Sequence, residues 1–171
     1  MLEPMKMLPR PRRRGLTLLE LAIVLAIVVI LAGLALPPMG ARLERQRVRG
    51  AAEALAGDLA EARYEATRRG LPLFLETRLG ADWCWSVATA PNCECGAPAS
   101  CQVHTAQASD HRGVRLVGGL AAKFDTTGTP QAVQAAAFET SKGDRLRVEL
   151  TPLGRPRICV EKGQWPQLSA C

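Results

Sequence analysis

Residues Leu16–Met39 read LTLLELAIVLAIVVILAGLALPPM, and they set the architecture of the N-terminal part of the chain. The stretch is apolar except for one carboxylate, Glu20, and it follows a basic leader that ends Arg12-Arg13-Arg14-Gly15. With its flanks, the apolar run reaches the roughly 20 residues that a helix needs to span a bilayer. A basic leader favours retention on the cytoplasmic side. We therefore predict a membrane-spanning helix that places the C-terminal part of the chain across the membrane.

Glu20 is the unusual residue of this run. A charge at the centre of a membrane helix costs roughly 2.5–3.5 kcal/mol on insertion scales, so such residues tend to be functional. A secretory signal peptide would have a shorter apolar core with a small-residue cleavage site after it. Here the apolar run is longer than such a core. A second interpretation is that Glu20, near one end of the span, extends to the lipid headgroups.

The segment Gly15-Leu16-Thr17-Leu18-Leu19-Glu20 resembles the prepilin signal of type IV pilins and type II secretion pseudopilins. The resemblance implies that a prepilin peptidase cleaves after Gly15 and methylates the new N-terminus at Leu16. Mature chains of this class usually begin with Phe, so Leu16 is a departure. A buried carboxylate needs a partner, and the ammonium group of a neighbouring subunit in a packed filament would supply one to Glu20.

The six cysteines all follow the apolar run, on the side expected to lie outside the cytoplasm. An even count in an oxidising compartment favours disulfides. They are Cys84, Cys93, Cys95, Cys101, Cys159 and Cys171. Cys159 and Cys171 lie far from the others and are expected to pair. The other four could pair in three ways, although Cys93 and Cys95 are too close to be good partners. Their spacing lacks the C-x2-C pairs typical of zinc sites, so we predict no metal.

Beyond Pro37-Pro38, where a kink or local break is expected, apolar residues recur at helical spacing and predict an amphipathic helix. The stripe consists of Val48, Ala52, Leu55, Leu59, Ala62 and Ala66. Gly70, preceded by Arg68 and Arg69, is a typical helix end.

After Gly70, short apolar segments alternate with glycine-containing turns and predict strands. The expected strands are residues 71–77, 83–89, 114–117, 121–125, 135–140, 145–151 and 157–160, and residues 90–100 are expected to form a disulfide-stapled loop. The predicted fold is α+β, with a long N-terminal membrane-anchoring helix packed on a small antiparallel β-sheet head. The expected divisions are a leader at 1–15, a membrane or filament-core helix half at 16–39, an amphipathic half at 40–70 and a β-rich head at 71–171.

The pattern Leu55-x3-Leu59-x2-Ala62-Arg63-x-Glu65-Ala66-x2-Arg69, followed by a strand and Trp83-x-Trp85, resembles the FimT/GspH group of minor pilins and pseudopilins. The resemblance implies a head of two small β-sheets packed on the long helix. We interpret this segment as helix-to-sheet packing and not as a binding site.

The best local candidate for a binding site is Gly154-Arg155-Pro156-Arg157. Pro156 biases Arg155 toward extended geometry, and residues two apart in an extended chain face the same side. Arg155 and Arg157 would then project together, and parallel guanidinium groups suit phosphate oxygens. The motif resembles the C-terminal DNA-binding motif Gly-Arg-x-Arg of FimT-type minor pilins. The alternative is a turn with two solvated arginines.

Other cations could extend this site. Lys162 would add a third positive charge, and Arg145 and Arg147 should share one strand face. The formal net charge of +6 is concentrated in the leader, so it is no argument for a nucleic-acid partner by itself.

Enzymatic chemistry is poorly supported. The two histidines, His104 and His111, lie in polar, loop-like surroundings, and the sequence contains no H-E-x-x-H, P-loop or G-x-G-x-x-G pattern. We therefore predict a non-enzymatic protein without a cofactor.

These observations lead to one functional hypothesis and one alternative. The hypothesis is a minor type IV pilin that binds double-stranded DNA without sequence preference for uptake in natural transformation. Before assembly it would be a single-pass inner-membrane protein with a periplasmic head, and it would then join a pilus at the cell surface. Its expected partners are other major and minor pilins, the prepilin peptidase, the inner membrane and DNA. The alternative is a minor pilin or type II secretion pseudopilin that primes or caps the filament and binds only protein partners.

Overall fold

The computed structural model describes residues 17–131 and 134–171, with side chains except at 34–39. The expected cleavage site at Gly15 and Leu16 lies outside the described residues. The chain divides into two compact units, Met1–Gly40 and Ala41–Cys171, which are considered separately.

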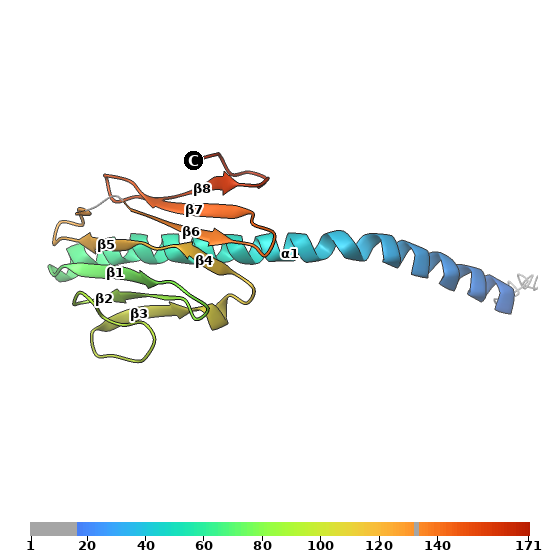
Figure 1. Cartoon of the computed structure of the whole chain (residues 1–171), viewed down its shortest axis with the longest axis horizontal. Helices are drawn as coiled ribbons and strands as arrows, with labels where there is room; N and C mark the ends of the chain where they lie inside the picture. The colour runs from blue at the N-terminus through green and yellow to red at the C-terminus, as the bar shows by residue number, and fades with distance from the viewer. Residues whose placement is uncertain (1–16, 132–133) are drawn as a thin grey trace, which may run out of the picture. The chain divides into compact units, whose positions relative to one another are not determined.

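The long helix α1 spans Leu18–Arg69 (Figure 1). Thr17 caps its N-terminus, because its Oγ1 accepts a hydrogen bond from the backbone N–H of Glu20 at 3.2 Å. Glu20 therefore sits in the first helical turn, where the helix dipole favours a carboxylate. The helix continues through Pro37 and Pro38, so a break there is wrong, whereas a kink stays a prediction.

The described part of the first unit carries an unpartnered apolar surface. Every residue from 17 to 33 is exposed. Among the residues whose placement is described, no helix combines the length and apolarity needed to cross a membrane.

The C-terminal end of α1 agrees with the sequence prediction. Gly70 has a φ of +63°, and the N–H of Leu71 donates to the carbonyl of Ala66 at 3.3 Å. This is the hydrogen-bond pattern of a Schellman cap, which favours glycine.

The strands of the second unit form two four-stranded antiparallel sheets. The first sheet has the order β3-β2-β1-β5, with β1 at Leu73–Arg78, β2 at Cys84–Ala88, β3 at Gln102–Gln107 and β5 at Ala121–Phe124. The second has the order β4-β6-β7-β8, with β4 at Arg115–Gly118, β6 at Ala135–Glu139, β7 at Arg145–Leu150 and β8 at Pro156–Lys162. A short 3-10 helix, η1, covers Ala108–Asp110.

Strand β3 was not expected from the sequence. It lies at the edge of its sheet beside β2, and only Ala106 of its residues is buried. A strand whose two faces are mostly solvated lacks the apolar alternation that identifies strands in a sequence.

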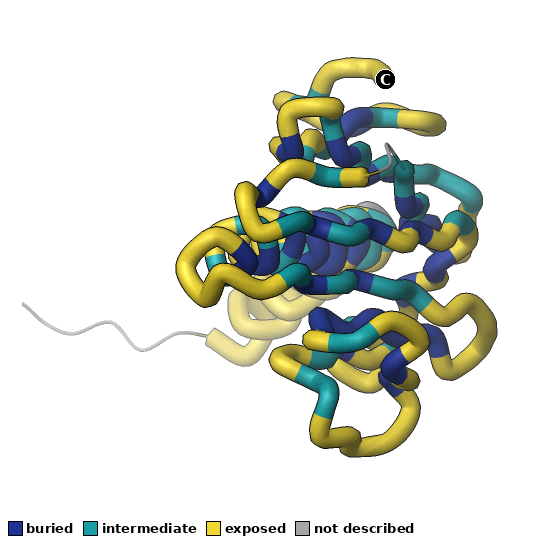
Figure 2. The backbone as a smooth tube through the Cα atoms, turned by 90° about the vertical axis from the view of Figure 1, so that its left-hand side faces the viewer, coloured by how far each residue is buried: buried dark blue, intermediate teal, exposed yellow. Residues whose placement is uncertain are grey.

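The core of the head lies between the helix and both sheets (Figure 2). The apolar stripe of α1 is buried as expected, with Val48, Ala52, Leu55, Leu59, Ala62 and Ala66 at most 1% exposed. Trp83 and Trp85 stack with ring centroids 5.5 Å apart. Phe138 of the second sheet meets both rings edge-on, at 5.8 and 6.0 Å. This aromatic cluster therefore joins the two sheets.

The last turn of α1 carries a charged cluster. Glu65 Oε2 lies 2.8 Å from Arg68 Nη2 and 2.5 Å from Arg69 Nε. Hydrogen bonds from Arg68 and Arg69 lower the pKa of Glu65 from 4.5 to about 2.

We expect Phe138→Ala to lower the free energy of unfolding by about 3–5 kcal/mol, because it opens a cavity between the two tryptophans and the second sheet. Urea unfolding of the full chain in detergent, followed by tryptophan fluorescence, measures the change. The partly exposed Phe74 provides the control, since Phe74→Ala should cost less. Equal losses for the two variants would contradict a special role for the aromatic cluster.

The pairs at Glu65 should make stability depend on pH in the acidic range. Because the folded-state pKa is lowered, the contribution of Glu65 is fully present above its unfolded value of 4.5 and is lost as pH falls toward about 2. Thermal unfolding should therefore show a steeper loss of stability between these pH values in the wild type than in Glu65→Gln. Identical slopes would show that the pairs contribute nothing.

Candidate nucleic-acid interface

The turn between β7 and β8 is tightly built around Gly154. Gly154 has a φ of +72°, and its N–H donates to the carbonyl of Thr151 at 2.8 Å. A Cβ at this position would lie 3.1 Å from Pro130 Cδ and 3.2 Å from Cδ and Nε of Arg63. Both the backbone conformation and the close neighbours therefore require glycine here.

Arg155 and Arg157 follow this turn directly, and both are exposed. The N–H of Arg155 donates to Thr151 Oγ1 at 3.1 Å. On β8, Ile158 and Val160 pack against the core, so Arg157 lies on the opposite, outer face of the sheet. Its Nη2 donates to the carbonyl of Ala170 at 3.2 Å. Within the described residues, neither arginine has a carboxylate partner.

Arg145 and Arg147 on β7 differ from Arg155 and Arg157 because they do have carboxylate partners. Arg145 Nε donates to Glu139 Oε2 at 2.5 Å, and Arg115 also binds this carboxylate. Arg147 Nη2 lies 3.1 Å from Glu161 Oε1. Arg147 thus has its own carboxylate partner, whereas Arg145 shares that of Glu139 with Arg115.

Lys162 ends β8 opposite Arg145. It is exposed, and no carboxylate pairs with it among the residues described. Lys162 therefore retains a free positive charge at the far end of the strand from Arg155.

Three disulfides order the head. Cys84 pairs with Cys95 and Cys93 with Cys101, which answers a question that the sequence leaves open. Cys159 pairs with Cys171, as expected, with their Cα atoms 4.9 Å apart. The described residues contain no free cysteine.

The Cys159–Cys171 disulfide fixes the C-terminal segment against the edge of β8. The N–H of Val160 donates to Ser169 O at 2.8 Å, and the N–H of Cys171 donates to Val160 O at 3.1 Å. Ala170 is thereby held where its carbonyl accepts from Arg157. The disulfide thus helps to fix the position of one of the two candidate arginines.

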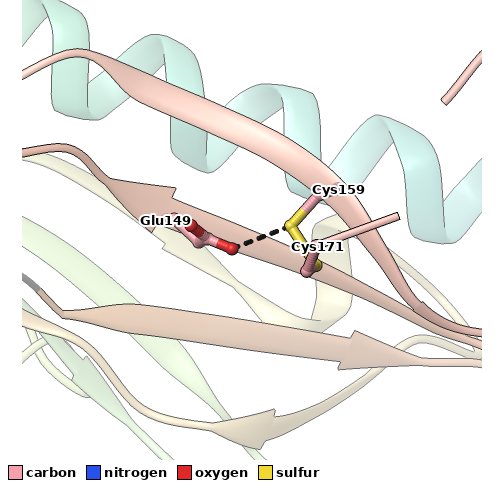
Figure 3. Close-up of side chains that lie close together, drawn as sticks. All are labelled: Glu149, Cys159 and Cys171. Atoms are coloured by element: carbon pink, nitrogen blue, oxygen red, sulfur yellow. Dashed lines mark hydrogen bonds between the residues drawn. A yellow bond between two sulfur atoms is a disulfide. The ribbon is translucent and has the colours of Figure 1, made fainter. Parts of the chain in front are cut away.

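Glu149 faces this disulfide (Figure 3). Its Oε1 lies 2.9 Å from Cys159 Sγ, and a ligand atom from each of Glu149, Cys159 and Cys171 lies within 4.8 Å of the others. Because the two sulfurs are bonded to each other, neither is a thiolate that could bind a metal.

Trp165 is only 8% exposed, and its Nε1 donates to Lys162 O at 3.2 Å. It therefore packs in the C-terminal loop, and its ring is not free to stack on a base. Arg63, which was not among the predicted site residues, lies beside the Gly154 turn, because a Cβ at Gly154 would lie 3.2 Å from its Cδ and Nε. Only the fold brings these distant positions together, so no sequence signal identifies the contact.

Comparisons with known proteins agree with this architecture. A family model described as type II transport protein GspH matches residues 51–154, and a prokaryotic N-terminal methylation motif matches residues 10–36. The pilin-like protein PilA1 of Thermus thermophilus is 35% identical over 155 residues, which cover 85% of this chain and 98% of that protein. The crystal structure of the type IV minor pilin FimU of Pseudomonas aeruginosa PAO1 covers 73% of this chain and 96% of its own, with a TM-score of 0.52 at 19% identity.

The fold and the N-terminal methylation motif define a pilin-like protein. The chain belongs to the GspH family of type IV minor pilins and pseudopilins. This confirms the resemblance seen in the sequence and the α+β pilin fold. The family is structural, not enzymatic, and the methylation motif includes Gly15, Leu16 and Glu20.

Replacing Cys159 and Cys171 by serine should lower the free energy of unfolding by about 3 kcal/mol, because a closed loop of this size restricts the unfolded chain. Urea unfolding of the full chain in detergent measures the loss. Non-reducing peptide mapping provides the control, since the Cys84–Cys95 and Cys93–Cys101 peptides should stay linked. An unchanged unfolding midpoint would show that the bond does not stabilise the head.

Proposed function

We propose that this protein is a minor pilin that assembles into a type IV pilus and binds double-stranded DNA through Arg155 and Arg157. The observation that supports DNA binding is the contrast in charge compensation on one sheet. Arg145 and Arg147 are paired with carboxylates, whereas Arg155 and Arg157 are exposed beside a rigid turn and lack such partners in the described chain. Uncompensated guanidinium groups on a fixed backbone suit phosphate oxygens.

Assembly would depend on the N-terminal unit. Cleavage after Gly15 by the prepilin peptidase, followed by methylation of Leu16, is supported by the matching motif. The exposed apolar residues 17–33 would lie in the inner membrane before assembly and against other pilins afterwards, since a large exposed apolar surface needs a partner. Glu20 would then pair with the N-terminal ammonium of a neighbouring subunit.

The corresponding organisation would be a leader at 1–15, a membrane or filament-core half at 16–39, an amphipathic half at 40–70 and a periplasmic head at 71–171. The head would reach the cell surface when the protein enters the pilus.

The DNA contact would be made through phosphates. Such contacts do not distinguish one base sequence from another. The logarithm of the binding constant falls linearly with the logarithm of the salt concentration. With two arginines as the main cations, and Lys162 only at the far end of β8, binding would be weak and reversible. These are properties suited to a filament that captures any DNA for uptake in natural transformation.

The alternative is that the protein primes or caps a filament and binds only protein partners. The match to a family described as a type II transport protein favours it. In that case the arginines beside Gly154 would contact other subunits or a secreted protein.

The test uses the full chain in detergent with its disulfides intact, titrated with random-sequence duplex DNA at several salt concentrations. The wild type should bind at low salt, and Arg155→Ala/Arg157→Ala should weaken binding and reduce the salt slope by about 2, one for each lost phosphate contact. Arg147→Ala is the matched control, because this arginine shares the sheet but pairs with Glu161.

No binding by the wild type at low salt would refute DNA capture and favour the protein-only alternative. Binding that survives the double substitution would place the site elsewhere on the head.

A further inference from the structure

An open hollow of about 500 Å³ lies between the last turns of α1 and the loop that follows β5. Its lining residues are Ala60, Arg63, Tyr64, Thr67, Arg68 and Thr127. The part of this lining that the structure describes offers two arginines, three hydroxyl groups and an aromatic ring. Arg68 is paired with Glu65, so Arg63 is the arginine of this lining without a carboxylate partner among the described residues. This combination suits a ligand that is both anionic and planar.

Tyr64 is the aromatic member of this lining and the only tyrosine of the chain. Its exposure of 66% leaves much of the residue in contact with solvent. In the described chain, no other aromatic ring stacks on it. Tyr64 therefore differs from Trp165, whose ring is buried.

Arg63 connects the hollow to the turn that carries Arg155. Its Nε donates to Gly128 O at 3.1 Å, and a Cβ at Gly154 would lie 3.2 Å from its Cδ and Nε. Among the described side chains it has no carboxylate partner. One cationic side chain thus lies between the hollow and the Gly154 turn.

The loop that walls the hollow is well ordered by Asp125. Its Oδ1 accepts hydrogen bonds from the N–H of Thr127 at 2.8 Å, from Thr127 Oγ1 at 2.6 Å and from the N–H of Thr129 at 2.9 Å. The shape of the hollow is therefore held by local hydrogen bonds.

We propose that this hollow binds an unpaired nucleobase of single-stranded DNA, stacked on Tyr64, while the adjoining phosphates contact Arg63 and Arg155. Stacking on an exposed aromatic ring accepts any base, because every base has a π-face. An intact duplex offers phosphates but covers the faces of its bases. The hollow would therefore add affinity for single strands or frayed ends. This inference rests on the proposed function only where it uses Arg155 as the neighbouring phosphate contact.

The test exploits the single tyrosine. The full chain, labelled with ¹³C in the tyrosine ring and held in detergent, gives one set of ring signals. These signals should shift upfield on addition of a short oligothymidylate. An oligomer of the same length with abasic sites should leave them unshifted, because it supplies phosphates without bases.

Affinities provide the second readout. Tyr64→Ala should weaken oligothymidylate binding about five- to tenfold and leave binding of a blunt duplex unchanged, whereas Tyr64→Phe should keep the wild-type affinity for both. The Phe variant is the matched control, since it preserves the ring and removes only the hydroxyl group.

The outcomes separate this inference from DNA capture by the Gly154 turn. If duplex binding depends on Arg155 and Arg157 but the Tyr64 ring does not shift, the hollow is not a base site and the proposed function stands. A shift with the abasic oligomer would also overturn base stacking. If the ring shifts with oligothymidylate even in Arg155→Ala/Arg157→Ala, the hollow is confirmed independently of the turn. If neither oligothymidylate nor duplex DNA binds, both the base site and DNA capture by the Gly154 turn are wrong.

Discussion

The head depends on one buried contact, in which Phe138 meets the stacked rings of Trp83 and Trp85. Each indole N–H in this contact has an acceptor: Trp83 Nε1 donates to Val114 O at 2.9 Å, and Trp85 Nε1 donates to Asp58 Oδ2 at 2.6 Å. A buried donor without an acceptor would cost about 1–3 kcal/mol. The ring contacts with Phe138 therefore join the two sheets. The hydrogen bond from Trp85 to Asp58 also holds strand β2 to α1.

Charge compensation on the second sheet follows from its strand register. Arg115, Glu139 and Arg145 lie opposite one another on β4, β6 and β7, so one buried carboxylate binds two guanidinium groups. Arg157 is opposite Glu149, but that carboxylate contacts the Cys159–Cys171 disulfide, and no ion pair forms between Arg157 and Glu149. Geometry and not charge count thus determines which cations remain available to a ligand.

Much of the fold could be predicted because the relevant signals are local. The stripe from Val48 to Ala66 and the stop at Gly70 follow from helical spacing and from the conformational freedom of glycine. Strand β3 could not be predicted, because an edge strand with one buried residue has no apolar periodicity. The sequence suggests that neighbouring carboxylates, Asp144 and Glu149, dilute the charge of Arg145 and Arg147. The actual partners, Glu139 and Glu161, could not be predicted, since they depend on strand register. Likewise, the role of Arg63 beside Gly154 exists only once the helix and the turn are packed together.

Arg63 lies where three segments meet, namely the last turns of α1, the loop at Gly128 and the turn at Gly154. Gly128 and Gly154 both adopt positive φ angles, and a Cβ at either would lie within 3.3 Å of Arg63 atoms. The two loops can approach the helix this closely only because they lack side chains there. The Gly154 turn is therefore positioned by α1, the same helix whose other face forms part of the core. A change that shifts the last turns of α1 would therefore also move the Gly154 turn and the two exposed arginines that follow it.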